Sequence, residues 1–570
     1  MEGLLSRLDV RQCAKWGANS LLACTLYIPS LLFAQTLPSS PNLSEPPGNI
    51  SQDQARQAAE AAAAARAARS NAPDAHLDGA GPSGLGPFPV EAKCFAVNRI
   101  VVDTVLPARL RWVPKHLAAF KGRCVGALGI NYILKSLEGD FLTRGLVTTR
   151  AGLPGQDLAK GTLHIAVVPG RLAGIQGGTA KQRRMWAAAS PMHVGDLVNL
   201  RRMEQALEQI RALPGGDAKA DLAPGDVPGE SILQIKVKSP RPVSAQVSVN
   251  NLGGATIGNW SGSGQISANN LLGRNESLAV NVNNRLFEPA MPANSTGSGI
   301  SLTVPSGYWT LGVSASQSHY RQEVVGSVAT FTTSNVLNTI AASLDRVIVR
   351  DSTSKTDLQL RIQRRWGRSY IDGVEIALQH QDLTDIALSL NDRRRFGEAR
   401  LDSSLSFRQG IGLLGAQADQ PGLPQSLPSA HYSIASLDLA LTAPLTKRLT
   451  WHSALRAQYS PRALFGPDVI SAGGPYTVRG YAGDHAIIGQ SGFYWRNELG
   501  FALNPHLQPY ALLDGGHVYA THYAPIGAGA GLRANLKWFS LDGFAALPLG
   551  NRSGLNQRHA QFGLTLGASI

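Results

Sequence analysis

From about Ser239 to its end, the chain alternates apolar and polar residues. The period of two is clear in 243–250, 277–284, 309–316 and 357–363. Such alternation places successive side chains on opposite faces of a β-strand. A soluble sandwich also alternates and is the alternative, but here the polar set includes large hydrophilic side chains and no helical segment intervenes. At ~20 residues per strand and connection, the pattern favours a transmembrane β-barrel of about sixteen antiparallel strands around an aqueous lumen.

The composition agrees with a two-faced β structure. Charged residues make up 16% of the chain, below the roughly 25% of ordinary soluble domains. The formal net charge is +14, but Lys and Arg are scattered and form no basic stripe with interleaved aromatic residues. We therefore expect no nucleic-acid partner, and expect the positive charge to line a surface or a pore.

The N-terminus has the pattern of a targeting signal. Arg7, Arg11 and Lys15 precede an apolar run at 18–34, which predicts a signal peptide over residues 1–34. The exact cleavage point stays open, because Leu32 stands where a small residue is usual. A single transmembrane anchor is the alternative, since the run is close to the ~17-residue minimum for spanning.

Two cysteines remain after removal of that signal. Cys13 and Cys24 would leave with it, and Cys94 and Cys124 would stay. A pair about thirty residues apart in an exported chain predicts one disulfide. The alternative is two buried thiols; a metal site is not expected, because neither cysteine belongs to a C-x-x-C pair.

An alanine-rich helix is predicted between two non-helical segments. Residues 35–50 are rich in Pro and Ser, residues 51–70 are strong helix formers, and 71–91 have the composition of a flexible linker. Ser51 followed by Gln54 has the form of a capping box. Because the helix has no large apolar stripe, it must be solvated or lie in a polar cavity.

Two small α/β units follow, over residues 92–171 and 172–238. Each has the order strand, helix, helix, strand, which indicates a tandem repeat of one module. In the second unit, Asp196 is the expected N-cap of a helix whose apolar face runs from Leu200 to Leu213.

Several separate stretches, in this order, resemble one known family. They are "CFAVNRI", "KGRCVGALGINYIL", "LVTTRAGLPGQDLAKGTLHIAVVPGRL", "YTVRGYAGD" and "GAGLRANLKW". They are similar to the outer-membrane transporters of two-partner secretion, the hemolysin secretion/activation and filamentous-hemagglutinin transporter family. The wider superfamily also contains the barrel-assembly insertases.

The resemblance implies two periplasmic polypeptide-transport-associated (POTRA) domains at 92–171 and 172–238, then a sixteen-stranded barrel over 239–570. It implies that the Ala-rich helix plugs the pore, and that the Cys94–Cys124 disulfide staples the first POTRA domain. The residues of this plug helix that we single out are Ser51, Arg56, Arg66 and Arg69.

The resemblance also implies a role for the loop at about 463–490. In the family, the loop motif that matches Val478, Arg479, Gly480 and Tyr481 folds back into the barrel. Its arginine pairs with an aspartate of the inner wall, which matches Asp514, with Gly516 on the same strand face. Two features stay open: Asp484 is a nearer alternative partner, and Arg479 could instead be one more pore-lining arginine.

Two departures from the family pattern weaken parts of this expectation. Leu512 stands where the family has an aromatic residue beside the aspartate, which predicts looser packing around the pair. The chain ends in Ile570, where outer-membrane barrels commonly end in an aromatic residue.

No catalytic or cofactor motif is present in the sequence, so we expect neither an enzyme nor a cofactor. The expected function is the export of a large unfolded exoprotein, recognised by its N-terminal secretion domain, across the outer membrane of a Gram-negative bacterium. Hemolysin, adhesin and contact-dependent toxin are all compatible cargoes. Other expected partners are outer-membrane lipid and, during biogenesis, the barrel-assembly machinery and periplasmic chaperones. The alternatives are an assembly factor that inserts other barrels and a plain diffusion porin.

Overall fold

The computed structural model describes residues 49–77, 85–254, 258–287, 293–325, 329–483, 486–519, 521, 523–549 and 559–570. The predicted signal peptide, most of the extended segment before the helix, and Asp484 lie outside the described residues.

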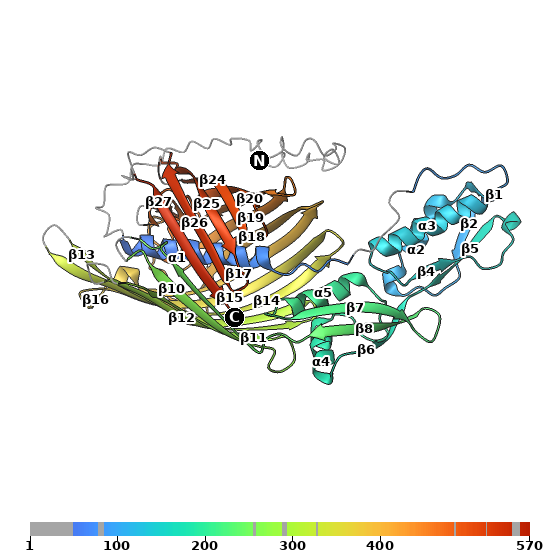
Figure 1. Ribbon diagram of the computed structural model, residues 1–570, viewed down its shortest axis with the longest axis horizontal. Coiled ribbons are helices and arrows are strands. Elements are labelled where there is room, and N and C mark those ends of the chain that lie inside the picture. The colour runs from blue at the N-terminus through green and yellow to red at the C-terminus, as the bar shows by residue number, and fades with distance from the viewer. Residues whose placement is uncertain are drawn as a thin grey trace. The chain divides into compact units, whose positions relative to one another are not determined.

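The C-terminal part of the chain is a closed antiparallel barrel of 16 long strands (Figure 1). A two-residue strand, β16 (Val374–Glu375), is added to one of them. The barrel closes where the last strand pairs with the first, from Thr565–Asn250 to Ser569–Gln246. The expected β-barrel is confirmed. In chain order the strands are β9 (Val243–Asn250), β10 (Ser261–Asn269), β11 (Ser277–Arg285), β12 (Ala293–Ser306), β13 (Trp309–Val325), β14 (Thr330–Arg350), β15 (Ser354–Ile371), β17 (Gln381–Phe396), β18 (Ala399–Ile411), β19 (Ser433–Pro444), β20 (Leu449–Tyr459), β23 (Gly492–Phe501), β24 (Leu507–Val518), β25 (Ile526–Asn535), β26 (Phe539–Pro548) and β27 (Gln561–Ser569).

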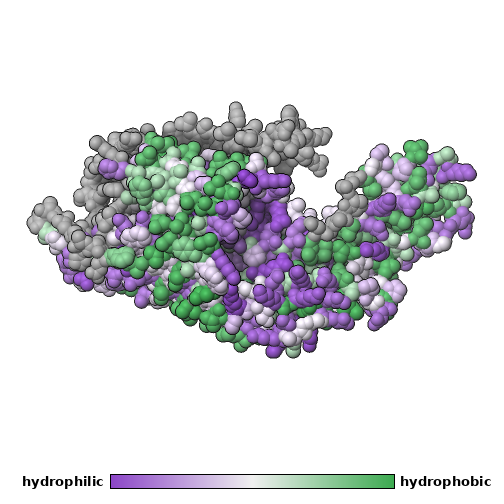
Figure 2. All heavy atoms as spheres, in the orientation of Figure 1, coloured by the Kyte–Doolittle hydropathy of each residue, from purple (hydrophilic) through white to green (hydrophobic). Residues whose placement is uncertain are grey.

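The period of two sorts the side chains of these strands as expected. Large apolar side chains such as Val280, Leu360 and Leu388 are exposed on the outer face, while polar side chains face the lumen. Figure 2 shows hydrophobic residues over the outside of the barrel and hydrophilic residues in the hollow between its strands. An apolar outer face and a polar lumen are what a barrel surrounded by lipid requires.

Two α/β domains precede the barrel and share one topology. In each, one strand from the start of the domain pairs in parallel with the last strand, and the strand before the last pairs antiparallel with it. This common arrangement agrees with a tandem repeat, although the first unit has three more strands than the sequence pattern predicts and the second has one more. The first domain has β1 (Phe95–Val97), β2 (Arg99–Val102), α2 (Val113–Leu117), β3 (Arg123–Val125), α3 (Ala127–Thr143), β4 (Arg150–Gly152) and β5 (Thr162–Val168); the second has β6 (Arg171–Gln176), α4 (Ala180–Ala189), α5 (Leu200–Arg211), β7 (Asp217–Pro224) and β8 (Glu230–Lys238).

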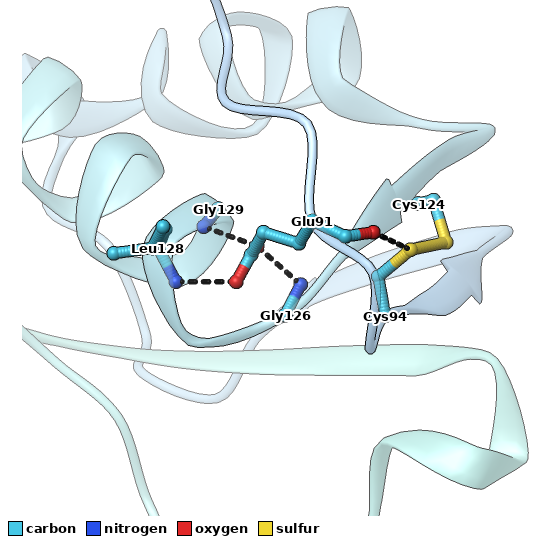
Figure 3. Close-up of a disulfide and its surroundings, with 6 residues drawn as sticks. All are labelled: Glu91, Cys94, Cys124, Gly126, Leu128 and Gly129. Carbon is cyan, nitrogen blue, oxygen red and sulfur yellow. Dashed lines mark hydrogen bonds between the residues drawn. A yellow bond between two sulfur atoms is a disulfide. The ribbon is translucent and has the colours of Figure 1, made fainter.

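The disulfide between Cys94 and Cys124 is confirmed, with 5.3 Å between the two Cα atoms (Figure 3). It joins the start of the first domain to β3. Beside it, the Glu91 carboxylate accepts hydrogen bonds from the backbone N–H groups of Gly126, Leu128 and Gly129, at 2.8–2.9 Å. Desolvation opposes ionisation of Glu91, but these three donors at the start of α3 lower its pKa.

Both sequence-predicted helix starts are wrong. Helix α5 is capped by Asn199, whose side chain accepts from the N–H groups of Arg201 and Arg202; Asp196 instead accepts from the N–H of His193 and pairs with Arg202. The alanine-rich helix α1 spans Asn49–Asn71, so Ser51 lies within its first turn rather than at a cap. Across the described ranges, every helix is too short or too polar to cross a membrane.

Candidate functional site

The segment between β20 and β23 folds into the barrel interior. It contains a short 3-10 helix, η6 (Gly466–Asp468), and a small antiparallel pair, β21 (Ile470–Ala472) with β22 (Ile487–Gly489). We call residues 460–491 the inward loop. Val478 and Tyr481 are buried in one apolar cluster with Ile470, Ala472, Ile487, Tyr494 and Val518. Apolar packing therefore fixes the loop against the inner faces of β23 and β24.

Arg479 lies buried at the centre of the inward loop and contacts Asp514 of β24. Its Nε and Nη2 donate to the two carboxylate oxygens at 2.6 and 2.9 Å, and its backbone N–H donates to Oδ2 at 3.2 Å. The Arg479 and Asp514 side chains are 1% and 0% exposed. This is a bidentate, charge-assisted pair, the geometry for which a guanidinium is better suited than an ammonium group.

A second carboxylate, which sequence reasoning missed, completes the arginine's partners. Nη1 of Arg479 donates to Glu498 of β23 at 2.5 Å, and Glu498 is also bound by Arg533 of β25 at 2.5 Å. Arg533 in turn donates to Asp542 of β26 at 2.9 Å. The ion-pair network therefore crosses four neighbouring strands of the inner wall. The period of two through Tyr494, Arg496 and Glu498 is the signal that could have placed Glu498 on the lumenal face.

The aromatic contact missing at Leu512 comes from another strand. Leu512 is 4% exposed and clusters with Tyr510 and Ala546. The guanidinium of Arg479 lies 5.7 Å from the ring centroid of Phe544 on β26, within the range of a cation–π contact. The expected loosening around the pair is therefore offset by a residue distant in sequence.

Two glycines allow the close approach of the loop to the wall. Gly480 has φ +101°, and a Cβ there would lie 2.8 Å from the Leu547 carbonyl group. A Cβ on Gly516 would lie 3.0 Å from the Phe493 carbonyl oxygen and 3.1 Å from a Val478 methyl group. Gly480 also donates its N–H to the Gln561 side chain at 2.9 Å, and Tyr481 donates its hydroxyl to the Ile526 carbonyl at 3.1 Å.

Helix α1 lies inside the barrel and is held by Arg66. The Nη1 of Arg66 donates to Asp438 of β19 at 3.1 Å and to the Tyr494 hydroxyl at 2.9 Å. Asp438 is paired with Arg456 as well, at 2.7 Å. The expected plug helix is therefore present, and it contacts the wall through a shared carboxylate.

The other two arginines singled out on the plug helix, Arg56 and Arg69, make different contacts. Arg56 bonds within the helix, to Asp53 at 2.7 Å and Glu60 at 3.5 Å, and its side chain lies against Gly483 of the inward loop. Arg69 makes no side-chain ion pair with the described residues; its carbonyl accepts a short hydrogen bond from Arg393. The side chain of Ser51 is outside what the structure describes.

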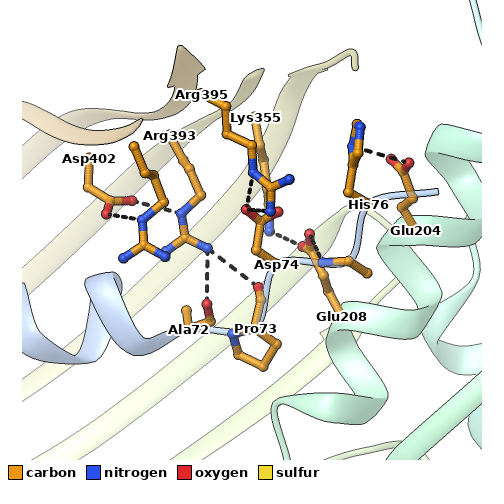
Figure 4. Close-up of polar contacts among 12 residues, drawn as sticks. Ala72, Pro73, Asp74, His76, Glu204, Glu208, Lys355, Arg393, Arg395 and Asp402 are labelled. Atoms are coloured by element: carbon orange, nitrogen blue, oxygen red, sulfur yellow. Dashed lines mark hydrogen bonds and ion pairs between the residues drawn. The ribbon is translucent and has the colours of Figure 1, made fainter. Parts of the chain in front are cut away.

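The segment that follows α1 is held by hydrogen bonds and an ion pair at the mouth of the barrel, although its composition predicts a flexible linker. Arg393 of β17 donates to the carbonyls of Ala72 and Pro73 at 3.1 and 3.4 Å, and Arg395 contacts Asp74 (Figure 4). These cations stand at the C-terminal end of α1, where they interact favourably with the helix dipole.

The same segment contacts helix α5 of the second α/β domain. The N–H of Ala75 donates to Glu208 at 3.2 Å and the N–H of Leu77 donates to Glu204 at 2.8 Å. Glu208 is also bound by Arg350 of β14 at 2.9 Å and by Lys355 of β15 at 2.8 Å. We call this set of contacts the mouth junction, because plug, barrel and α/β domain all meet in it.

The two glutamates of the mouth junction differ in acidity. Burial opposes ionisation of Glu208, but hydrogen bonds and charge from Arg350 and Lys355 lower its pKa to about 2. Burial dominates at Glu204 and raises its pKa. Within the ranges that the structure describes, no group of three or more His, Cys, Asp or Glu residues is placed to hold a metal ion.

Comparison with known proteins places this architecture in one family. Residues 229–534 match the model of the haemolysin secretion/activation protein ShlB/FhaC/HecB, residues 95–170 match the ShlB-type POTRA domain, and residues 171–224 match a POTRA domain. Over 97% of its length, the chain is 32% identical to the outer membrane transporter CdiB-2 of Burkholderia pseudomallei (strain 1026b), of which it covers 99%.

Solved structures agree with this placement. CdiB from Escherichia coli superposes with a TM-score of 0.81 at 27% identity, over 92% of this chain and 99% of that one. CdiB from Acinetobacter baumannii, at 24% identity, shares the fold with a TM-score of 0.80 over 91% of this chain and 99% of that one. The chain therefore belongs to the ShlB/FhaC/HecB haemolysin secretion/activation family, the outer-membrane transporters of two-partner secretion, whose POTRA domains lie in the periplasm.

Proposed function

We propose that this transporter exports one large exoprotein through its barrel in an unfolded state, after helix α1 has left the lumen. The observation that carries the proposal is a polar lumen filled by a helix that few ionic contacts retain. Only Arg66 among its arginines makes an ion pair with the described barrel wall. Such a helix can be displaced without unfolding the barrel.

The cargo we infer is an exoprotein of the contact-dependent toxin type. The full-length relative and the two superposed structures are CdiB transporters, which favours this cargo over a hemolysin or an adhesin. The cargo's N-terminal secretion domain would add to a free edge of a POTRA sheet, such as β7, or lie in a groove beside it. Export would need no catalytic step, because folding outside the cell supplies the drive.

In this proposal, Arg479 is a positioning residue. A buried ion pair contributes little net stability compared with apolar packing, but removing one partner leaves a costly unpaired charge. The Arg479–Asp514–Glu498 contacts therefore favour one position of the inward loop over all others. Insertion of this chain into the membrane would require the barrel-assembly machinery and periplasmic chaperones.

The test is secretion of the neighbouring exoprotein by cells with and without this chain. We expect the exoprotein in the medium or on the cell surface when the chain is present, and in the periplasm when it is absent. Outer-membrane levels of other barrels should not change. Unchanged export would contradict the proposal, and a general loss of other barrels would favour the assembly-factor alternative.

A further inference from the structure

Helix α1 divides the lumen into two spaces with different walls. One cavity of about 920 Å³ lies along β9–β14 and β25–β27, beside Gln57, Glu60, Ala61 and Ala64 of the helix. A second cavity of about 470 Å³ lies along β15–β20, beside the opposite helix side that carries Ala58, Ala62 and Ala65. The helix thus separates two surfaces that an exported chain could follow.

The wall of the larger cavity carries no ionisable side chain among its described barrel residues. Its polar groups are hydroxyls and amides. We call this surface the uncharged wall, represented by Gln246, Ser263, Gln265, Asn281, Ser316 and Thr565. Ser263 and Ser316 are exposed to the lumen.

The wall of the smaller cavity, the charged wall, is dense in ion pairs. Asp468 of the inward loop is bound by Arg365 at 3.1 Å and by Arg408 at 2.7 Å. Asp438 is bound by Arg456 and by Arg66 of the plug. These charges already hold the base of the inward loop and the plug helix, so a passing chain would have to break structural contacts there.

We propose that the exported polypeptide moves along the uncharged wall. This inference rests on the proposed function and names the surface of the lumen that the cargo contacts. Ser, Thr, Asn and Gln side chains both donate and accept hydrogen bonds, so they can satisfy an extended backbone of any sequence. Conduction needs contacts that are numerous but weak, and a wall without fixed charge retains neither acidic nor basic segments of the cargo.

The size of the track suits an extended chain. Crossing a hydrocarbon core of ~30 Å takes about nine extended residues at ~3.3 Å each. The cavity beside the plug is already lined by polar groups of nine strands. A folded domain would need a much wider opening, whereas an extended strand can exchange hydrogen bonds with one side chain after another.

The experiment compares single cysteines on the two walls during export. Ser263→Cys and Ser316→Cys lie on the uncharged wall, and Ser406→Cys and Ser436→Cys are matched positions on the charged wall. Cys94 and Cys124 are tied in a disulfide and do not compete. Each cysteine carries a short photo-cross-linker in the full-length transporter, and the cargo is stalled by a tightly folded C-terminal fusion. Yields are normalised to labelling of each cysteine with a small maleimide in the same stalled complex.

We expect normalised cross-linking to the cargo to be several-fold stronger at positions 263 and 316 than at 406 and 436. Equal yields, or stronger yields on the charged wall, overturn the proposed track but leave export through the lumen intact. Continued secretion with no cross-link at any of the four positions overturns both the track and the proposed function. With unfused cargo, illumination after export is complete should give no cross-links.

Discussion

At the scale of single residues, the position of Arg479 is specified by more partners than an isolated ion pair would provide. Asp514 binds two of its side-chain nitrogens, Glu498 binds the third, and Phe544 lies against the guanidinium. Gly480 removes the Cβ that would collide with the wall. A lysine could occupy the space but could not reproduce the fork of hydrogen bonds.

Replacing Arg479 tests whether its contacts with Asp514 and Glu498 are needed for export. Arg479→Ala leaves Asp514 without its buried cationic partner, at a cost of about 3–5 kcal/mol for a buried pair that loses one partner, while Glu498 stays paired with Arg533. We expect normal outer-membrane levels, a protease-sensitive inward loop and strongly reduced export, with Arg479→Lys intermediate. Arg462→Ala is the matched control, because Arg462 lies in the same loop and makes no ion pair with the described residues. Unimpaired export by Arg479→Ala would contradict the positioning role.

Gly480→Ala tests the backbone requirement separately from the charge. A non-glycine residue at φ +101° is strained by about 1–3 kcal/mol, and the added Cβ meets the backbone of Leu547. We expect the same protease sensitivity of the loop as in Arg479→Ala, although both charges remain. Gly155→Ala, at a position with open space and no strained φ, should behave as wild type; equal behaviour of the two variants would show that the loop tolerates displacement.

At the scale of elements, the plug helix has one arginine, Arg66, in an ion pair with the described barrel wall, and hydrogen bonds from Arg393 and Arg400 hold its C-terminal carbonyls. Arg66 bridges to Asp438 and Tyr494, while alanines face both cavities. An apolar stripe on the helix would have held it by burial against an apolar patch of the barrel wall. That patch would then line the lumen once the helix had left. One shared carboxylate gives retention that an incoming chain can overcome.

Arg66→Ala should raise the population of open pores. It removes hydrogen bonds to charged groups worth about 1.5–3 kcal/mol, and Asp438 stays paired with Arg456. That change corresponds to about a tenfold or larger shift in the equilibrium between plugged and open states. Planar-bilayer conductance measures it, with Arg69→Ala as the control on the same helix. Identical conductance of the two variants would mean that Arg66 does not retain the plug.

The strands and helices show which features of the fold can be predicted from the sequence pattern and which cannot. Strand periodicity is a local property, and it placed Val280, Val313 and Leu360 on the outer face as the structure has them. Helix starts depend on where the incoming chain turns, so Asn199 caps α5 although Asp196 stood ahead of it. Glu498 and Phe544 reach Arg479 only through the register of β23, β24 and β26, which no short motif contains.

At the scale of the whole molecule, the mouth junction connects plug, barrel and POTRA domain through one helix. Glu208 of α5 accepts from the backbone of Ala75, from Arg350 and from Lys355. Displacement of the segment after α1 therefore removes a partner from the contact between α5 and the barrel. We infer that release of the plug and movement of the second POTRA domain are energetically coupled.

The acidity of Glu208 makes this coupling testable by pH. Its pKa is about 2 in the folded protein and ~4.3 in an unfolded chain, so its stabilisation is complete above ~4.3 and is lost as pH falls through about 2. Lowering the pH from 7 to about 4 should therefore leave the junction closed, even though Glu204, whose pKa is raised, takes up its proton first. Glu208→Gln should open it at pH 7, since truncating a buried charge pair costs about 2–5 kcal/mol.

Spin labels on α5 and on the barrel turn near Gly307 report the opening as a longer, broader distance distribution. Gln209 donates to the Gly307 carbonyl at 2.5 Å, so Gln209→Ala removes a neutral contact at the same interface and serves as the control. We expect Glu208→Gln to broaden the distance and also to raise pore conductance, whereas Gln209→Ala should change the distance alone. If Glu208→Gln moved α5 without any effect on conductance, the plug would be independent of the POTRA domain. The segment at Ala75 would then hold α1 in the lumen without its hydrogen bond to the Glu208 carboxylate.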